Sequence, residues 1–148
     1  MAIGASGSQQ ILTQSGWRSL KSLYDGYVSG GISLGIAYVE PTSFNTIKYM
    51  TIRQVYNHSI GLGVRLTTED GTICVVSAYG AILDLAEDYP PRPTIMHPSD
   101  AKCLVGPNMN SSDKYLVRRI DKREFVTINC YSLPVPNMVA KGGFVIID

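Results

Sequence analysis

Short runs of β-branched and aromatic residues, separated by turn residues, are the main pattern of this sequence. Residues 46–56 alternate two sets of side chains, and both sets contain apolar residues, which predicts a strand covered partly on both faces. Residues 63–68 and 72–77 are two further β-rich runs, and Glu69-Asp70-Gly71 lies between them. Asp-Gly between two such runs is a strong hairpin signal. The pattern predicts a chain built mainly from short antiparallel strands.

The same pattern predicts further strands at residues 9–13, 32–40 and 144–147, and a hairpin of 115–120 with 124–133 around Asp121-Lys-Arg123. Leu20, Leu23 and Tyr24 have the spacing of one helical turn within residues 19–24, and we expect Asp25-Gly26 to end it. Residues 81–88 fit a strand end or a brief helix. Residues 89–113 hold five prolines and predict a long, irregular, Pro-rich connection.

Composition bounds the class of protein. At 148 residues, 45% hydrophobic and 17% charged, the chain predicts one globular domain spanning residues 1–148. A net charge of +1 gives no electrostatic case for nucleic acid or an anionic membrane. No apolar run approaches the ~20 residues of a membrane span. The start Met1-Ala-Ile-Gly4 lacks the features of a signal peptide. Three cysteines predict reduced thiols rather than a disulfide framework.

Few side chains form a recognisable catalytic or metal-binding motif. His97, Asp100 and Cys103 lack the ligand number and spacing of a zinc site, so we predict no metal site and no cofactor. His58 follows Asn57 and is predicted to make a surface or capping contact in a turn. The basic cluster at residues 118–123 is interleaved with acidic residues, which favours a solvated hairpin tip over a phosphate-binding site.

Three segments together resemble one family. The first runs from Gly4-Ala-Ser-Gly-Ser8 through a strand, the turn Ser15-Gly-Trp17 and a helical turn; the second is the hairpin at residues 64–83. The third covers residues 115–148 and ends in Met138-Val-Ala-Lys-Gly-Gly-Phe-Val-Ile-Ile-Asp148. They are similar to the opening, the Thr-x-x-His hairpin and the closing strands of the Hint family, which contains inteins and hedgehog-type autoprocessing domains. The resemblance implies an all-β, horseshoe-shaped fold of intertwined strands with one or two short helices, whose two ends meet at the centre.

The resemblance also implies where the splicing groups would lie. The family's first nucleophile, a Cys or Ser, falls on Gly4, and its Thr and His fall on Ser77 and Gly80. The penultimate His and the terminal Asn fall on Ile147 and Asp148. A shift of one residue would place the nucleophile at Ala5, and Ser6 and Ser8 offer displaced hydroxyls. Because four of the five groups are lost, we expect no catalytic residues and no enzymatic activity.

The expected function is therefore that of a splicing-inactive Hint-fold protein that serves as an assembly component of a bacteriophage virion, in its tail, baseplate or neck. One alternative is a protein-splicing intein, active or trapped by mutation, and another is a peptide-binding module. We expect partners to be other protein subunits, without nucleic acid, membrane or small-molecule substrate. Localisation would be the virion or the host cytoplasm. The candidate contact residues are Tyr38, Tyr89, Pro90, Pro91 and Met96.

Overall fold

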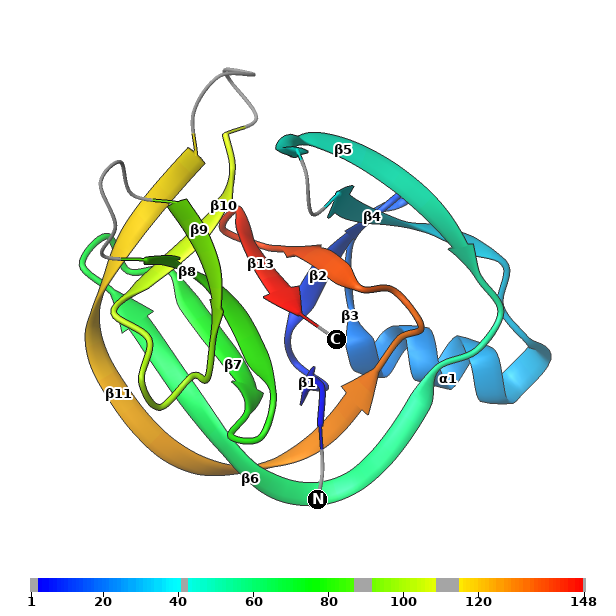
Figure 1. The fold of residues 1–148 in the computed structure, drawn as a ribbon. Helices are drawn as coiled ribbons and strands as arrows, with labels where there is room; N and C mark the ends of the chain where they lie inside the picture. Colours follow the sequence, from blue (N-terminus) through cyan, green and yellow to red (C-terminus); the bar gives the residue numbers. More distant parts are fainter. Residues whose placement is uncertain (1–2, 41–42, 87–91, 109–114, 148) are drawn as a thin grey trace.

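The chain folds into antiparallel strands and a single α-helix over the residues that the structure describes (Figure 1). The structure, a computed structural model, describes residues 3–40, 43–86, 92–108 and 115–147. The elements are β1 (Ala5–Ser6), β2 (Gln10–Thr13), β3 (Gly16–Ser19), α1 (Leu20–Gly30), β4 (Leu34–Glu40), β5 (Ser43–Ile52), β6 (Tyr56–Thr68), β7 (Ile73–Ser77), β8 (Ala81–Ala86), β9 (Arg92–Met96), β10 (Cys103–Pro107), β11 (Tyr115–Ser132), β12 (Asn137–Ala140) and β13 (Phe144–Ile147). None of the described helical segments is long and apolar enough to cross a membrane.

The strands form two sheets. The first has the order β1-β7-β6-β11-β10, and β1 also pairs with β11, so that β1, β7, β6 and β11 close into a ring. The second has the order β3-β2-β4-β12-β13-β8-β9, with β5 beside β4. The long strands β6 and β11 curve around the outside, and β1 and β13 lie towards the centre (Figure 1). The predicted all-β class is thereby confirmed.

The core lies between the two sheets and is almost entirely aliphatic. The larger cluster joins side chains from both ends of the chain, including Ile11 and Leu20 from the start and Phe144 and Ile146 from the end, all at most 1% exposed. A second cluster packs strands β4, β8, β10, β12 and β13 around Val139. Apolar burial of this kind contributes about 25 cal/mol per Å², so the chain ends are held by the core.

The helix is longer than predicted. Ser19 caps its start, where its Oγ accepts a hydrogen bond from Ser22 N at 3.2 Å. Leu20 and Leu23 face the core, and Lys21 pairs with Asp25 one turn later at 3.1 Å. The helix runs past Asp25-Gly26 to Gly30, and the next residue, Gly31, caps it with a φ of 83° that interrupts helical geometry.

The hairpin predicted around Asp121 is absent. The structure has one continuous strand, β11, which pairs with β6 from Ile120 to Ser132 and absorbs Asp121 in a bulge between Ile120 and Lys122. The connection predicted as irregular over 89–113 also differs, because it contains β9 and β10. Pairing with β8 and β11 extends these segments despite their prolines. Residues 89–91 and 109–113 of that connection lie outside the described residues.

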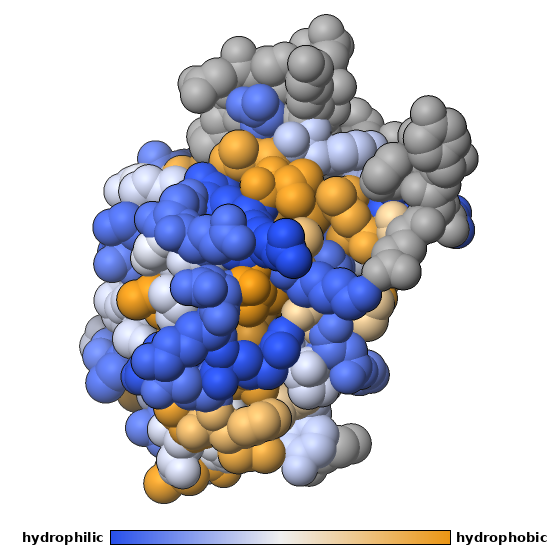
Figure 2. Space-filling model, turned by 90° about the vertical axis from the view of Figure 1, so that its left-hand side faces the viewer, coloured by the Kyte–Doolittle hydropathy of each residue, from blue (hydrophilic) through white to orange (hydrophobic). Residues whose placement is uncertain are grey.

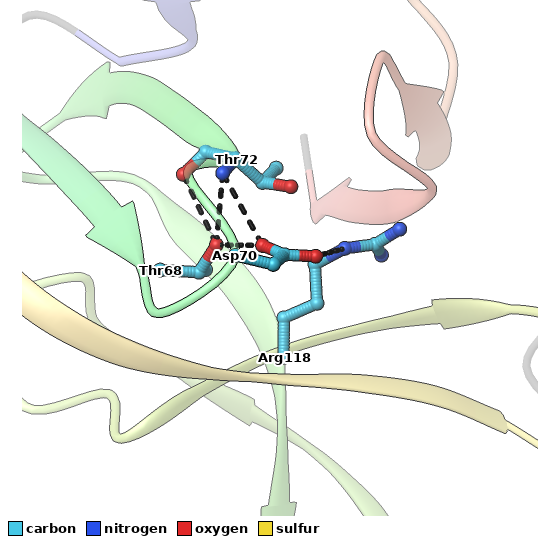
Figure 3. Close-up of polar contacts among 4 residues, drawn as sticks. All are labelled: Thr68, Asp70, Thr72 and Arg118. Atoms are coloured by element: carbon cyan, nitrogen blue, oxygen red, sulfur yellow. Dashed lines mark hydrogen bonds and ion pairs between the residues drawn. The ribbon is translucent and has the colours of Figure 1, made fainter.

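The Asp-Gly hairpin is confirmed, and its turn holds a polar network (Figure 3). Asp70 accepts hydrogen bonds from the Thr68 hydroxyl and from Thr72 N at 3.2 Å. Its second oxygen accepts a charge-assisted bond from Arg118 Nε on β11, at 2.9 Å. The Thr68 hydroxyl, with help from Thr72 and Arg118, lowers the pKa of the Asp70 carboxyl from 3.8 to about 2. The turn therefore fastens the β6–β7 hairpin to β11.

Replacing Asp70 by Asn should lower the free energy of unfolding near neutral pH, because the ionised carboxylate is the favoured partner of Thr68, Thr72 and Arg118. A folded-state pKa below the usual 3.8 gives stability that is present above about pH 4 and lost as the pH falls toward 2. Urea unfolding of both proteins should therefore show a difference that shrinks over this range. Asp25→Asn, on the exposed helix surface, controls for loss of a charge. An equal difference at every pH would contradict the prediction.

Candidate functional site

Four of the five positions that the resemblance assigns to splicing come together at the centre of the molecule. Gly4 O accepts a hydrogen bond from Ser77 N at 2.8 Å, and Gly80 N donates to Ser77 O at 3.0 Å. A Cβ built on Gly80 would lie 3.4 Å from Gly4 O. Ile147 on β13 pairs with Ala81, the neighbour of Gly80. Asp148 lies outside the described residues. The start, the β7–β8 turn and the last strand thus form one site.

Gly4 is fitted to its place so tightly that no side chain is accommodated there. Its φ is 89°, and a Cβ on it would lie 2.1 Å from Tyr131 O and 3.0 Å from Ser132 Cβ. Such a φ is left-handed backbone that residues with a side chain rarely adopt. Ala5 is fully buried in β1, between Val76 and Tyr131. The backbone around the first position is therefore built for a residue without a Cβ.

Ser77 is buried and held in place on both sides. Its Oγ accepts a hydrogen bond from Tyr79 N at 3.2 Å and also interacts with the Cys130 thiol. Burial raises the pKa of Cys130, and the bond with Ser77 opposes that rise only in part. Because the thiolate is the nucleophile, Cys130 is kept in its less reactive form. The three cysteines are free thiols, two of them buried and Cys103 half-buried.

Both histidines of the chain lie at this site. His97 follows β9, and its Nδ1 lies 3.2 Å from Gly80 O. Its turn is held by Arg123 of β11, which donates from Nε to Pro98 O at 3.1 Å. His58 lies on β6, and its Nε2 is 2.6 Å from Ser132 Oγ. The prediction of a surface contact for His58 in a turn is wrong, because the residue is half-buried and belongs to a strand.

A β-bulge directs His58 toward Ser132. Ile60 pairs with Asn129 and Asn57 with Tyr131, so two residues of β6, His58 and Ser59, lie opposite Cys130 alone. Ser59 has a φ of 64°, and within the described segments it is the only non-glycine residue with positive φ. Asn57 Oδ1 supports it by accepting from Ser59 N at 2.8 Å. Strained backbone next to a bulge is typical of places where a side chain must be aimed.

An open, mostly apolar cleft adjoins this pair. It has a volume of about 530 Å³, the size of a small-ligand pocket, and is lined by Ile3, Tyr56, His58, Ser132 and residues 133–136. Ile3 is 43% exposed, whereas Ser132 is 4% exposed. The residue before Gly4 therefore lines the same cleft as the Ser132–His58 pair.

Of the five candidate contact residues, two are half-buried and three lie outside the described residues. Tyr38 is half-buried in β4, opposite Met138, and Met96 at the end of β9 packs against the core. Tyr89, Pro90 and Pro91 lie outside the described residues. In the part of the chain that is described, no three His, Cys, Asp or Glu side chains gather as metal ligands. The sequence analysis missed the His58–Ser132 pair, since 74 positions separate its members and no motif joins them.

Comparison with known proteins identifies the fold. No family model and no curated protein matches the sequence. Among solved structures, the TvoVMA intein matches with a TM-score of 0.80 and 18% identity, over 98% of this chain and 97% of that one. The transcription factor IIB Mvu mini-intein matches at 0.76 and 17%, over 98% and 100%. A DnaB intein from Synechocystis sp. PCC 6803 matches at 0.73 and 17%, over 97% of each chain.

These matches correct one expectation. From the loss of side chains at Gly4, Gly80, Ile147 and Asp148 we expected no enzymatic activity. The structures that share the fold over almost the whole chain are inteins, which are self-splicing proteins, and this contradicts the expectation. What the matches show directly for this chain is the intein-like Hint fold.

Substituting Gly4 by Cys should destabilise the fold rather than simply supply the missing thiol, because the new Cβ would overlap Tyr131 O. We expect a loss of about 2 kcal/mol or more in the free energy of unfolding, measured by urea denaturation. Gly16→Cys is the matched control: φ there is 90°, but nothing lies within 4 Å of the built Cβ. Equal losses at the two positions would show that the contact with Tyr131 contributes nothing.

Proposed function

Because this chain has the intein-like Hint fold, we propose that it is an autoprocessing domain that cleaves the peptide bond between Ile3 and Gly4. The observation that carries the proposal is the convergence of Gly4, Ser77, Gly80 and both histidines at one site. Hydroxyl and imidazole groups placed beside a fixed peptide bond are the groups that acyl transfer uses.

The geometry supports cleavage at the start of the chain by fixing that junction. Gly4 O is bonded to Ser77 N, and Gly4 packs against the Tyr131 backbone, so the preceding peptide bond has little freedom. Because the fold already holds the reacting bond in place, less entropy is lost when the reaction occurs. Asp148 carries a carboxylate where cyclisation in the family uses the amide nitrogen of Asn. The proposed activity is therefore cleavage at one junction, without ligation.

The test uses the full chain with a reporter protein joined before Met1. Incubation of the folded fusion near neutral pH should release the reporter and leave a product that begins at Gly4, read by intact mass and by N-terminal sequencing. The same fusion kept unfolded in urea should stay intact, because the site exists only in the fold. A folded fusion, checked by circular dichroism, that remains whole after prolonged incubation would overturn the proposal.

A second candidate function, assembly with other protein subunits, is favoured by the exposed apolar side chains. Figure 2 shows one side of the molecule, where apolar areas interrupt a mostly hydrophilic surface. Exposed apolar residues on the described strands include Ile60, Leu62, Ile73, Ile95, Val117 and Phe125. Ile95 is 63% exposed on β9, an edge strand of its sheet, and such an edge can pair with another chain. A phage tail, baseplate or neck is the setting we propose for such a partner.

If β9 takes part in assembly, Ile95→Lys should weaken association, because a charge on an edge strand opposes pairing with another chain. Sedimentation velocity over a range of concentrations should show association of the unaltered chain and its loss in the variant. Val28→Lys, on the exposed face of α1, is the control. A chain that sediments as a monomer at every concentration would remove self-association as the form of this assembly.

A further inference from the structure

We infer that Ser132 and His58 are the nucleophile and the general base of this site, and that they act on the bond between Ile3 and Gly4. The inference rests on the proposed function and names the groups that perform it. Ser132 occupies the end of β11, and its Cβ lies 3.0 Å from the point where a Gly4 side chain would begin. The hydroxyl missing from the first position is thus replaced from a neighbouring strand.

The pair has the geometry of an activated nucleophile. His58 Nε2 and Ser132 Oγ are 2.6 Å apart, within the range in which a base takes the proton of an attacking hydroxyl. Ser132 is 4% exposed, so this bond is shielded from water on most sides. The bulge at His58 and Ser59 places the imidazole against Ser132. The positive φ of Ser59 costs conformational energy, and such strain is typical of functional sites.

The cleft explains how the bond is presented. Ile3, the residue that supplies the carbonyl, lines the same cleft as Ser132 and His58. Gly4, which supplies the amide nitrogen, is anchored through Ser77. Leu133 and Val135, both at most 3% exposed, form an apolar wall beside the pair. Because Gly4 has no Cβ, its backbone packs directly against Tyr131 O and lies close to the Ser132 side chain.

The reaction balances within the chain and one water molecule. Ser132 Oγ forms a bond to the Ile3 carbonyl carbon while His58 accepts the hydroxyl proton. The carbon–nitrogen bond to Gly4 then breaks, and His58 returns the proton to the leaving Gly4 nitrogen. The product is an ester between Ile3 and Ser132. Water hydrolyses this ester, releasing the segment that ends at Ile3 and restoring the serine.

Other nucleophiles at the site fit less well. The Cys130 thiol is buried and interacts with Ser77, and burial raises its pKa. The Ser6 hydroxyl is 3.0 Å from that of Ser8 and has no imidazole beside it in the contacts described. The Ser77 hydroxyl accepts a hydrogen bond from Tyr79 N and interacts with the Cys130 thiol. The Ser132 hydroxyl, by contrast, lies 2.6 Å from the Nε2 of His58.

The test compares variants of the reporter fusion. Ser132→Ala should abolish cleavage, and His58→Gln, which keeps a hydrogen-bond acceptor but no base, should slow it by about 100-fold or more. Ser132→Cys should form a thioester in place of the ester, so that added dithiothreitol speeds release of the reporter. Ser29→Ala, on the exposed end of α1, is the control and should cleave like the parent chain. Urea unfolding midpoints confirm that each variant is folded.

A second measurement separates this inference from the proposed function. A fluorophosphonate probe, which bonds to activated serines with loss of fluoride, should add its mass to the peptide that contains Ser132 in an Ile3→Gly variant, and not after His58→Gln. If the parent fusion cleaves and Ser132→Ala cleaves equally fast, the inference fails and the function stands. If nothing cleaves but Ser132 is labelled in a His58-dependent way, the function fails and the reactive pair stands. If the fusion is not cleaved and Ser132 is not labelled, both the inference and the proposed function are overturned.

Discussion

The pairing of β6 with β11 is the constraint on which the rest of the structure depends. These strands are antiparallel neighbours from Thr68 opposite Ile120 to Tyr56 opposite Ser132. Backbone hydrogen bonds along such a ladder fix the register, and a shift by one residue would turn every side chain to the opposite face. The two interruptions of this register are the bulge that absorbs Asp121 and the bulge that turns His58 onto Ser132. One ladder thus determines both the overall curvature and the geometry of the site.

The site combines a preserved scaffold with changed side chains. Four positions meet where the resemblance to the Hint family places them: Gly4, Ser77, Gly80 and Ile147. Only Ser77 of these carries a hydroxyl group. The polar groups that could react come instead from β6, β11 and the turn after β9. Gly4 is held by contacts with the Tyr131 backbone that only glycine permits. Fold and chemistry are therefore separable here, and function has to be argued from the site.

Local signals in the sequence were enough for some elements and not for others. The hairpin around Asp70 was predictable, because Asp-Gly favours the turn that two β-rich runs need. Asp121 is also a residue that favours turns, but pairing with β6 on both sides of it outweighs that local preference. The positions Gly4, Ser77 and Gly80 were found through the family resemblance. The Ser132–His58 contact was not, since it depends on a bulge and on a register that no local pattern encodes.

The ring formed by β1, β7, β6 and β11 has a kinetic consequence for any reaction at its start. Because β1 pairs on both sides, a break before Gly4 would leave the new amino group fixed in the ring instead of letting it diffuse away. The departing segment would then be the only mobile product, retained by little more than the cleft that Ile3 lines. The amine would stay poised for the reverse reaction until water reached the acyl group. Turnover in such a protein would be governed by the competition between escape and recapture, and the chain that remained would keep its shape.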